Sequence, residues 1–402
     1  MEVFKVLSEE IDECIKECIQ DVISIRRYIH ANPELSLKEY KTSELVYEEL
    51  MKLKLDVEKN VGKTGVVANL NKNTNGKTIM LRADMDALPL HENTNLEFKS
   101  KVDGVMHACG HDVHTSILLG TAKVLNSLKN YINGNVKFVF QPAEENNPIG
   151  GAPLMIEEGV LENPKVDAAL GLHVWDLPVG TIGTRKGAIM SQSDRIFITI
   201  KGKSAHGSAP QNGKDAIICA SHLITALQTI VSRNISPMDS AVVTISSIHG
   251  GIRYNVIADK VELEGTVRCS EPKVGKFLPK RIEEIIKGIC DTYDCDYEFK
   301  YGYGYPVTFN DHDLTKGVLK SLNSNFGGNN IIELEHPNTG GEDFSFFTKV
   351  IPSNFMFLGC KSNINKDNCV IHNPNFICDE DCIPFGIKAL VTLAIDYLNG
   401  NM

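Results

Sequence analysis

The sequence predicts an α/β protein with a largely parallel sheet, into which a second, ferredoxin-like α+β domain is inserted. Short apolar runs alternate with helical patterns between residues 65 and 174, as expected for parallel strands covered on both faces. After residue 183 the pattern changes, with polar and apolar residues alternating over 195–201, and after Pro306 the first pattern returns. A chain of 402 residues is long enough for about two domains.

The first half of the chain predicts the helices and strands of the larger domain. Apolar residues at helical spacing predict an amphipathic helix over 8–30, which ends before Asn32-Pro33. Strands are expected at 65–70, 78–83, 136–141 and 168–174, and helices at 113–128 and near 152–158.

The second half of the chain predicts the inserted domain and then the remaining elements of the first domain. Strands at 195–201, 241–247, 256–267 and around 296–301, with helices at 215–232 and 274–290, follow the order βαββαβ of a ferredoxin-like module. Helices at 314–322 and 384–398 and strands at 331–334 and 355–358 then continue the first domain. We therefore predict one domain over 1–183 and 303–402, and an inserted domain over 184–302.

Composition excludes several functional classes. With 41 Lys+Arg against 51 Asp+Glu the net charge is −10, whereas a nucleic-acid-binding protein would show a basic stripe. We see no apolar run of about 18 residues and therefore expect no membrane span. The N-terminus lacks the residue order of a secretory signal, and the 11 cysteines are scattered, so we expect reduced thiols and a cytoplasmic location.

Potential metal ligands gather where the predicted strands end, which is where open α/β sheets bind ligands. They are Asp84, Asp86, Cys109, His111, Glu144, Glu145 and His173, joined far downstream by His372. Thiolate, imidazole and carboxylate together suit zinc or a neighbouring first-row metal. Because burying so many polar groups without compensation is costly, the pattern predicts a metal site.

The adjacent Glu144 and Glu145 indicate hydrolysis. Neighbouring residues at a strand end point in different directions, so one carboxylate can bind metal while the other faces the substrate water. Such a carboxylate can accept a proton from metal-activated water and pass it to a leaving amine. For Asp84 and Asp86, the residues alone leave a capped loop as an equal alternative.

Six segments, in order, resemble those of metal-dependent amidohydrolases: aminoacylases, hippurate hydrolases, auxin-conjugate hydrolases and N-acetyl-diaminopimelate deacetylases. These enzymes belong to the broader carboxypeptidase-G-like metallopeptidase superfamily. The segments are 81–90, 107–114, 141–145, 171–174, 203–210 and 340–344, and the resemblance extends from His30 to the C-terminus.

The resemblance implies two divalent metal ions, either zinc or manganese, cobalt or nickel. Glu144 matches the general base, and Asp86 matches an aspartate that orients a metal-binding histidine. Asp84 occupies the place of a histidine ligand of the broader superfamily, which leaves its role open. The positions that match metal ligands are Cys109, His111, Glu145, His173 and His372.

The resemblance also implies that the inserted domain is a lid that forms a homodimer or larger assembly. Its His206 matches a residue that hydrogen-bonds the developing oxyanion. Arg253, Asn255 and Arg268 are candidates for binding a substrate carboxylate, which guanidinium groups bind in bidentate fashion. Structural caps or surface positions are equal alternatives for these three.

We expect an enzyme that cleaves the amide bond of N-acyl amino acids, releasing a carboxylic acid and a free amino acid. A dipeptidase or carboxypeptidase using the same metal centre is the alternative. A non-catalytic binding protein on a decayed hydrolase fold is disfavoured, because every expected donor and Glu144 are present.

Overall fold

The computed structural model describes residues 2–72 and 75–402, with side chains from residue 7 onward. The chain divides into two compact units, which are described separately below. The first unit contains residues 1–189, 309–336 and 343–402, and the second contains 190–308 and 337–342. The first two changes of unit fall a few residues after the expected boundaries, within strands β7 (Gly187–Met190) and β12 (Thr308–Asn310). The assignment of residues 337–342 to the second unit was not expected from the sequence.

The first unit is built around an eight-stranded mixed sheet whose central strands are parallel, as the sequence predicted. The order is β1-β2-β4-β3-β5-β14-β6-β13. Antiparallel pairs occur where β1 meets β2, β2 meets β4, and β14 meets β6. The strands are β1 (Asp56–Val61), β2 (Gly65–Leu70), β3 (Thr78–Asp84), β4 (Asn135–Gln141), β5 (Ala168–Pro178), β6 (Ile182–Thr184), β13 (Ile331–Glu333) and β14 (Ser353–Lys361).

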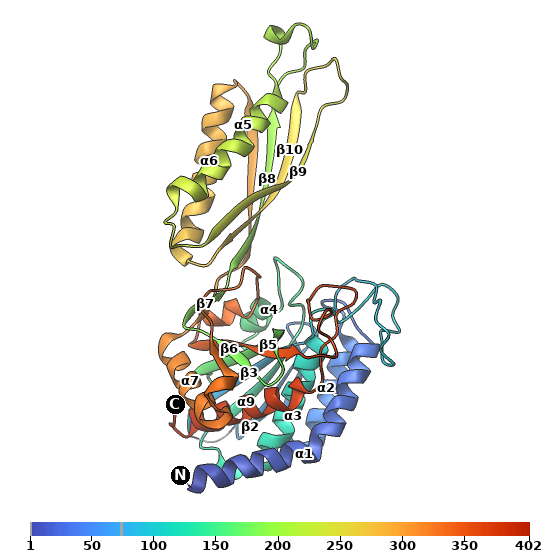
Figure 1. Cartoon of the computed structure of the whole chain (residues 1–402), viewed down its shortest axis with the longest axis vertical. Helices are drawn as coiled ribbons and strands as arrows, with labels where there is room; N and C mark the ends of the chain where they lie inside the picture. Colours follow the sequence, from blue (N-terminus) through green and yellow to red (C-terminus); the bar gives the residue numbers. More distant parts are fainter. Residues whose placement is uncertain (1, 73–74) are drawn as a thin grey trace. The chain divides into compact units, whose positions relative to one another are not determined.

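Helices cover this sheet and bury both faces of its central strands. α3 (His111–Ser127) and α9 (Cys382–Leu398) contact β3, and α1 (Glu2–Ala31) packs against both helices (Figure 1). Met356 and Leu358 of β14 join the core that these helices share. On the opposite side of that strand, the Phe355 ring centroid lies 5.2 Å from that of Phe344, so apolar residues occupy successive positions.

The N-terminus of α3 is anchored to α1 by a buried ion pair. Arg26 Nε and His30 Nδ1 each lie 2.8 Å from Asp112 Oδ2, and all three side chains are 1% exposed. Since Asp112 directly follows His111, these contacts fix the start of the helix that carries one predicted ligand. The remaining helices of the unit are α2 (Tyr40–Lys52), α4 (Ala152–Glu157), α7 (His312–Phe326) and α8 (Ser345–Thr348).

The second unit is an antiparallel four-stranded sheet in the order β11-β8-β10-β9, with two helices on one face (Figure 1). Ile196 and Ile198 of the sheet share a core with Leu223 and Leu278 of the helices. The elements follow the order βαββαβ: β8 (Gln192–Lys201), α5 (Ala216–Thr229), β9 (Ala241–Gly250), β10 (Lys260–Cys269), α6 (Pro272–Thr292) and β11 (Asp296–Tyr305).

One helical run in this unit, Ala216–Asn234, is long and apolar enough by length and composition to cross a membrane. Cys219, Leu223 and Leu227 of this run are fully buried in the core of the unit. Core helices of soluble domains meet the same criterion, so the run is only a weak indication of a membrane span.

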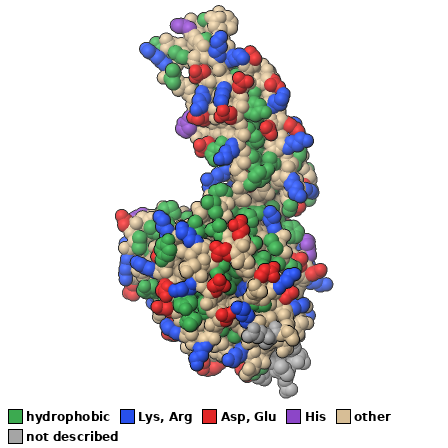
Figure 2. Space-filling model, turned by 180° about the vertical axis from the view of Figure 1, so that it is seen from behind, with side chains coloured by type: hydrophobic (Ala, Val, Ile, Leu, Met, Phe, Trp, Pro, Cys, Tyr) green, Lys and Arg blue, Asp and Glu red, His purple; other side chains and the backbone are tan. Residues whose placement is uncertain are grey.

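Charged side chains of both signs are interspersed on the face of the molecule that Figure 2 shows. No basic stripe stands out on that face.

Candidate metal centre

The register of the central strands gathers the predicted site residues of the first unit. Asp84 pairs with Gln141 across β3 and β4, and Arg82 pairs with Gly171 across β3 and β5. The carboxyl ends of these three strands therefore lie side by side. The segments that carry Asp86, Glu144 and His173 continue from these ends toward the same place.

A glycine turn aims Cys109 and His111 at one point. Gly110 adopts a φ of +87° at the N-cap of α3, a left-handed conformation that favours glycine. A Cβ atom at this position would lie only 2.4 Å from Cγ2 of Val174. Together with His173 of β5, the two residues flanking this turn place their ligand atoms within 4.8 Å of one another.

The thiol of Cys109 lies between two imidazoles. Its Sγ is 3.2 Å from Nε2 of His173 and 3.2 Å from Nε2 of His372. His372 comes from the segment after β14, and its backbone amide donates to the carbonyl of Ala108 at 2.7 Å. Its Nε2 is also 3.1 Å from Oε1 of Glu145.

The five predicted ligands therefore form two overlapping sets that share one sulfur. Cys109, His111 and His173 make the first set, and Cys109, Glu145 and His372 make the second. The first set is buried, whereas the His372 side chain is 51% exposed. The centre is thus open to solvent on the side of His372.

The electrostatics of the centre favour a bound cation. Although burial lowers the pKa of His111, Asp84 and Asp86 raise it to about 10. Burial, Glu145 and Glu144 raise the pKa of the Cys109 thiol well above its usual value. The carboxylates thus concentrate negative charge that divalent ions would neutralise, and a coordinated thiol is deprotonated.

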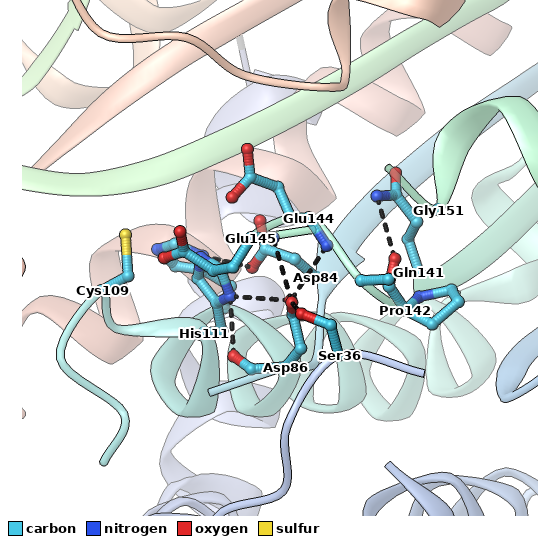
Figure 3. Close-up of polar contacts among 12 residues, drawn as sticks. Ser36, Asp84, Asp86, Cys109, His111, Gln141, Pro142, Glu144, Glu145 and Gly151 are labelled. Atoms are coloured by element: carbon cyan, nitrogen blue, oxygen red, sulfur yellow. Dashed lines mark hydrogen bonds and ion pairs between the residues drawn. The ribbon is translucent and has the colours of Figure 1, made fainter. Parts of the chain in front are cut away.

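Asp86 connects the histidine ligand to the two glutamates. Nδ1 of His111 lies 2.9 Å from the Asp86 carbonyl and 3.2 Å from its carboxylate, so it donates its proton there. Among the described residues, the buried Nε2 of His111 has no hydrogen-bond partner, so its lone pair is available to a metal ion. The Asp86 carboxylate also accepts the backbone amides of Glu144 and Glu145, at 3.1 and 3.0 Å, and the hydroxyl of Ser36 (Figure 3).

Asp84 makes different contacts. Its Oδ2 accepts from Arg82 at 2.6 Å, and its Oδ1 is 2.7 Å from Nδ1 of His114. Since Nε2 of His114 accepts the amide of Val174 at 2.8 Å, Nδ1 carries the proton and donates to Asp84. Asp84 thereby holds β5 at the residue after His173.

A buried hydrogen-bond network beside the centre was not assigned a role in the sequence analysis. Asp343 accepts from Arg82 at 2.7 Å, from Gln141 at 2.7 Å, and from the amide of Gly151 at 2.9 Å. Its own amide lies 3.4 Å from Oε1 of Glu144. The segment 340–344, which the resemblance included, was the available signal for Asp343.

In the second unit, the structure brings together two of the four predicted residues. His206 forms a β-bridge with Val256, and the amide of Gly207 donates to the carbonyl of Asn255 at 2.9 Å. Nδ1 of the exposed His206 accepts the amide of Ser208 at 3.1 Å, so the proton of the neutral ring is on Nε2.

The two arginines are arranged differently. Arg253 is exposed in the loop that carries Asn255. Arg268 is the second-last residue of β10 and donates to the carbonyl of Val267 at 3.1 Å. The three candidates for binding the substrate carboxylate therefore do not form one cluster within this unit.

Comparison with known proteins identifies extensive similarity. Residues 80–396 match the model of Peptidase family M20/M25/M40. Thermostable carboxypeptidase 2 of Saccharolobus solfataricus is 42% identical over 398 residues, which cover 98% of this chain and 99% of that protein. N-acyl-L-amino acid amidohydrolase of Geobacillus stearothermophilus is 43% identical over 304 residues, covering 75% of this chain and 81% of that one.

Among solved structures, similarity includes a Bacillus subtilis protein described as a dinuclear metal binding peptidase from the M20 family. It aligns with a TM-score of 0.82 at 35% identity, over 96% of this chain and 99% of that chain.

Proposed function

The chain belongs to Peptidase family M20/M25/M40, and on this premise we propose that it hydrolyses the amide bond of N-acyl amino acids. The products are a carboxylic acid and a free amino acid. The observation that carries the proposal is the pair of donor sets that share Cys109, with Glu144 within 4.8 Å of His111 and Glu145. The relative named as an N-acyl-L-amino acid amidohydrolase supports this reaction.

We propose that the centre binds two divalent ions, zinc or else manganese, cobalt or nickel. Cys109, His111 and His173 would hold one ion, and Cys109, Glu145 and His372 the other. The dinuclear centre of the M20 structural neighbour supports this stoichiometry. When bound, the ions would polarise the acyl oxygen and lower the pKa of water.

Glu144 is the proposed general base. Its carboxylate accepts the proton of the attacking water and delivers it to the leaving nitrogen. Asp86 supports this role, because its carboxylate binds the backbone amides of Glu144 and Glu145 as well as the ring of His111.

The second unit is the proposed lid. His206, with the proton on Nε2, has the donor that a developing oxyanion requires. Arg253, Asn255 and Arg268 are proposed to bind the substrate carboxylate.

The lid is also the proposed site of homodimer formation, through the edge strand β9. In the described chain β9 pairs only with β10, and Ile217, Ile248 and Tyr254 near this edge are exposed. An unpaired edge with exposed apolar residues is suited to pairing with a second copy.

We also propose that the protein is located in the cytoplasm.

Carboxypeptidase activity is a second candidate, favoured by the 42% identity to a protein named thermostable carboxypeptidase 2. The two reactions are chemically close, because the last residue of a peptide is an amino acid acylated by the rest of the chain. A panel of N-acetyl and N-benzoyl amino acids, N-blocked peptides and free dipeptides, each with added zinc, manganese, cobalt or nickel, separates these activities.

Substitution of Glu144 tests the proposed reaction. Glu144→Gln should lower kcat by about 10²–10⁴-fold because it removes the proton acceptor, with two metal equivalents still bound. Cys109→Ala is the matched control, since it should lower the metal content itself. Metal analysis and hydrolysis of N-acetyl amino acids measure both effects, and wild-type turnover of the Gln variant would remove Glu144 as the base.

A further inference from the structure

Glu39 is a buried carboxylate, outside the roles assigned above, that reaches the turn carrying Glu144. Its side chain is fully buried. Oε1 accepts the backbone amide of Ala143 at 2.9 Å, across 104 residues of sequence. Ala143 directly precedes Glu144, so this bond lies one residue away from the proposed general base.

The position of Glu39 at the N-cap of α2 does not explain this orientation. Its side chain makes no capping hydrogen bond to the helix. Glu34 instead accepts the amides of Lys41 and Thr42, each at 2.9 Å. The Glu39 carboxylate is therefore free to point inward.

Inside the unit, three donors converge on the Glu39 carboxylate. In addition to Ala143, Oε1 accepts the amide of Leu37 at 2.9 Å, and Oε2 accepts the hydroxyl of the buried Thr64 at 2.6 Å. These bonds come from three separate segments. They hold the carboxylate in one place and satisfy the requirement that a buried charge be hydrogen-bonded.

The turn that Glu39 holds has an unusual backbone conformation. Ala143 has a φ of +57°, in the left-handed region that residues other than glycine rarely adopt. Such a conformation persists only where the surroundings impose it, and it is concentrated at functional sites. Here Glu39 binds the amide of Ala143, and Asp86 binds the next two amides. Two carboxylates thus bind three successive amides.

This arrangement places two acidic groups around one turn at an electrostatic cost. Burial and the charge of Asp86 raise the pKa of Glu39 to about 7. An amide or apolar side chain would avoid that cost. Local features that oppose stability are expected where function requires them.

We propose that Glu39 is a positioning residue for Glu144. By accepting the amide of Ala143 it fixes the left-handed turn, and the turn fixes the direction in which the Glu144 carboxylate points. This inference rests on the proposed function, because it takes Glu144 as the general base.

Two substitutions of nearly equal volume test it. Glu39→Met removes the acceptor and keeps the space filled, whereas Glu39→Gln keeps a carbonyl oxygen for the Ala143 amide. The Met variant should lower kcat for an N-acetyl amino acid by about 10–100-fold, with KM changed less than about 3-fold, because misplacement of a catalytic group affects turnover. The Gln variant should recover kcat to within about 3-fold of wild type, and both should bind the wild-type amount of metal.

Glu34→Gln is the matched control on the same segment. It weakens the cap of α2 without touching Ala143, so it should lower Tm and leave kcat unchanged. If Glu34→Gln and Glu39→Met lower kcat equally, or if Glu39→Met keeps wild-type kcat, the positioning role is wrong. Should the Met variant not fold, Glu39→Asp decides, because its shorter side chain withdraws the acceptor; wild-type kcat would again overturn the inference.

The double variant Glu39→Met/Glu144→Gln separates this inference from the proposed function. If Glu39 acts through Glu144, adding Glu39→Met should not lower the residual activity of Glu144→Gln any further. If the loss of kcat in the double variant equals the product of the losses in the two single variants, Glu39 acts elsewhere and the inference is overturned. Wild-type turnover of Glu144→Gln alone would instead contradict the proposed function, whatever Glu39 does.

Discussion

Asp84 occupies the position for which the sequence left two roles open. Both of its oxygens already accept hydrogen bonds, from Arg82 and from His114, and the side chain is fully buried. Although burial raises it, His111, Arg82 and His114 hold the pKa of this carboxyl well below its usual value. We therefore regard Asp84 as a support for the metal-binding strand β5.

Substitution of Asp84 by Asn distinguishes support from metal ligation. Removing one member of a buried ion pair leaves Arg82 partly uncompensated, so the free energy of unfolding should fall by about 3 kcal/mol. With saturating metal, the variant should still bind two equivalents. Denaturant unfolding and metal analysis measure these quantities, and loss of one equivalent at saturation would identify Asp84 as a ligand.

Glu39 should make stability depend on pH in a direction unusual for a carboxylate. Its pKa in the folded chain is raised from 4.5 to about 7 by burial and Asp86, so the unfolded chain releases this proton first. The folded state is therefore favoured at low pH, and this contribution is lost as pH rises from about 4.5 to about 7, by about 3 kcal/mol in total.

Glu39→Gln should remove this contribution. In metal-free protein, the variant should gain stability relative to wild type by about 2–3 kcal/mol between pH 5 and pH 8. Unfolding in denaturant at several pH values gives the difference directly. Parallel pH dependence of the two proteins would show that Glu39 does not titrate in this range.

The turn between Cys109 and α3 depends on glycine for two reasons. The φ of +87° disfavours a side chain, and a Cβ atom would lie 2.4 Å from Val174. Gly110→Ala should therefore lower the free energy of unfolding by about 3 kcal/mol, from backbone strain plus overpacking. Because the turn aims Cys109 and His111, metal affinity should also fall at least tenfold.

Gly104→Ala is the matched control for that turn. Gly104 also has a positive φ, +71°, but a Cβ atom there would meet nothing within 4 Å. The Gly104→Ala variant should lose only about 1 kcal/mol of unfolding free energy, from backbone strain, and should keep its metal affinity. Thermal unfolding and metal titration compare the two variants; equal effects would contradict the steric account of Gly110.

The strands that carry the centre could be predicted because burial on both faces produces uninterrupted apolar runs. The sequence did not predict β1 or α2. β1 is an edge strand whose residues Asp56–Val61 are mostly polar and only partly buried, so it has no apolar run. α2 (Tyr40–Lys52) buries Thr42, Ser43 and Glu49 beside Val46 and Leu50, which weakens its apolar pattern.

The predicted ligands can be recognised in the sequence, whereas the residues that support them cannot. Cys109, His111 and Glu145 are found within short motifs, and the donor chemistry itself indicates a metal. Glu39 and Ala143 are 104 residues apart, and Arg82 and Asp343 are 261 apart. No local pattern marks such pairs, because only the folded sheet brings their segments together.

The division into two units separates metal binding from the proposed substrate contacts. All five proposed ligands, together with Glu144, belong to the first unit, whereas His206, Arg253, Asn255 and Arg268 belong to the second. The chain leaves the first unit through β7 and returns through β12, and it later contributes only residues 337–342 to the second unit. Strands β7 and β12 pair with each other. The points of exit and return therefore lie on neighbouring strands.

This topology allows the long insertion to be excised, while residues 337–342 of the second unit remain. Replacing residues 191–307 by a Gly/Ser linker of about eight residues should leave a folded first unit, because insertions joined at adjacent ends are readily removed. The shortened chain should bind two metal equivalents but should not hydrolyse N-acetyl amino acids, since it lacks the proposed oxyanion donor and carboxylate-binding residues. Full-length His206→Ala is the control, and it should likewise keep its metal and lose turnover. Metal analysis together with an amidase assay tests both chains. Turnover by the shortened chain would contradict the lid assignments, whereas loss of metal from a folded shortened chain would show that the centre requires the second unit.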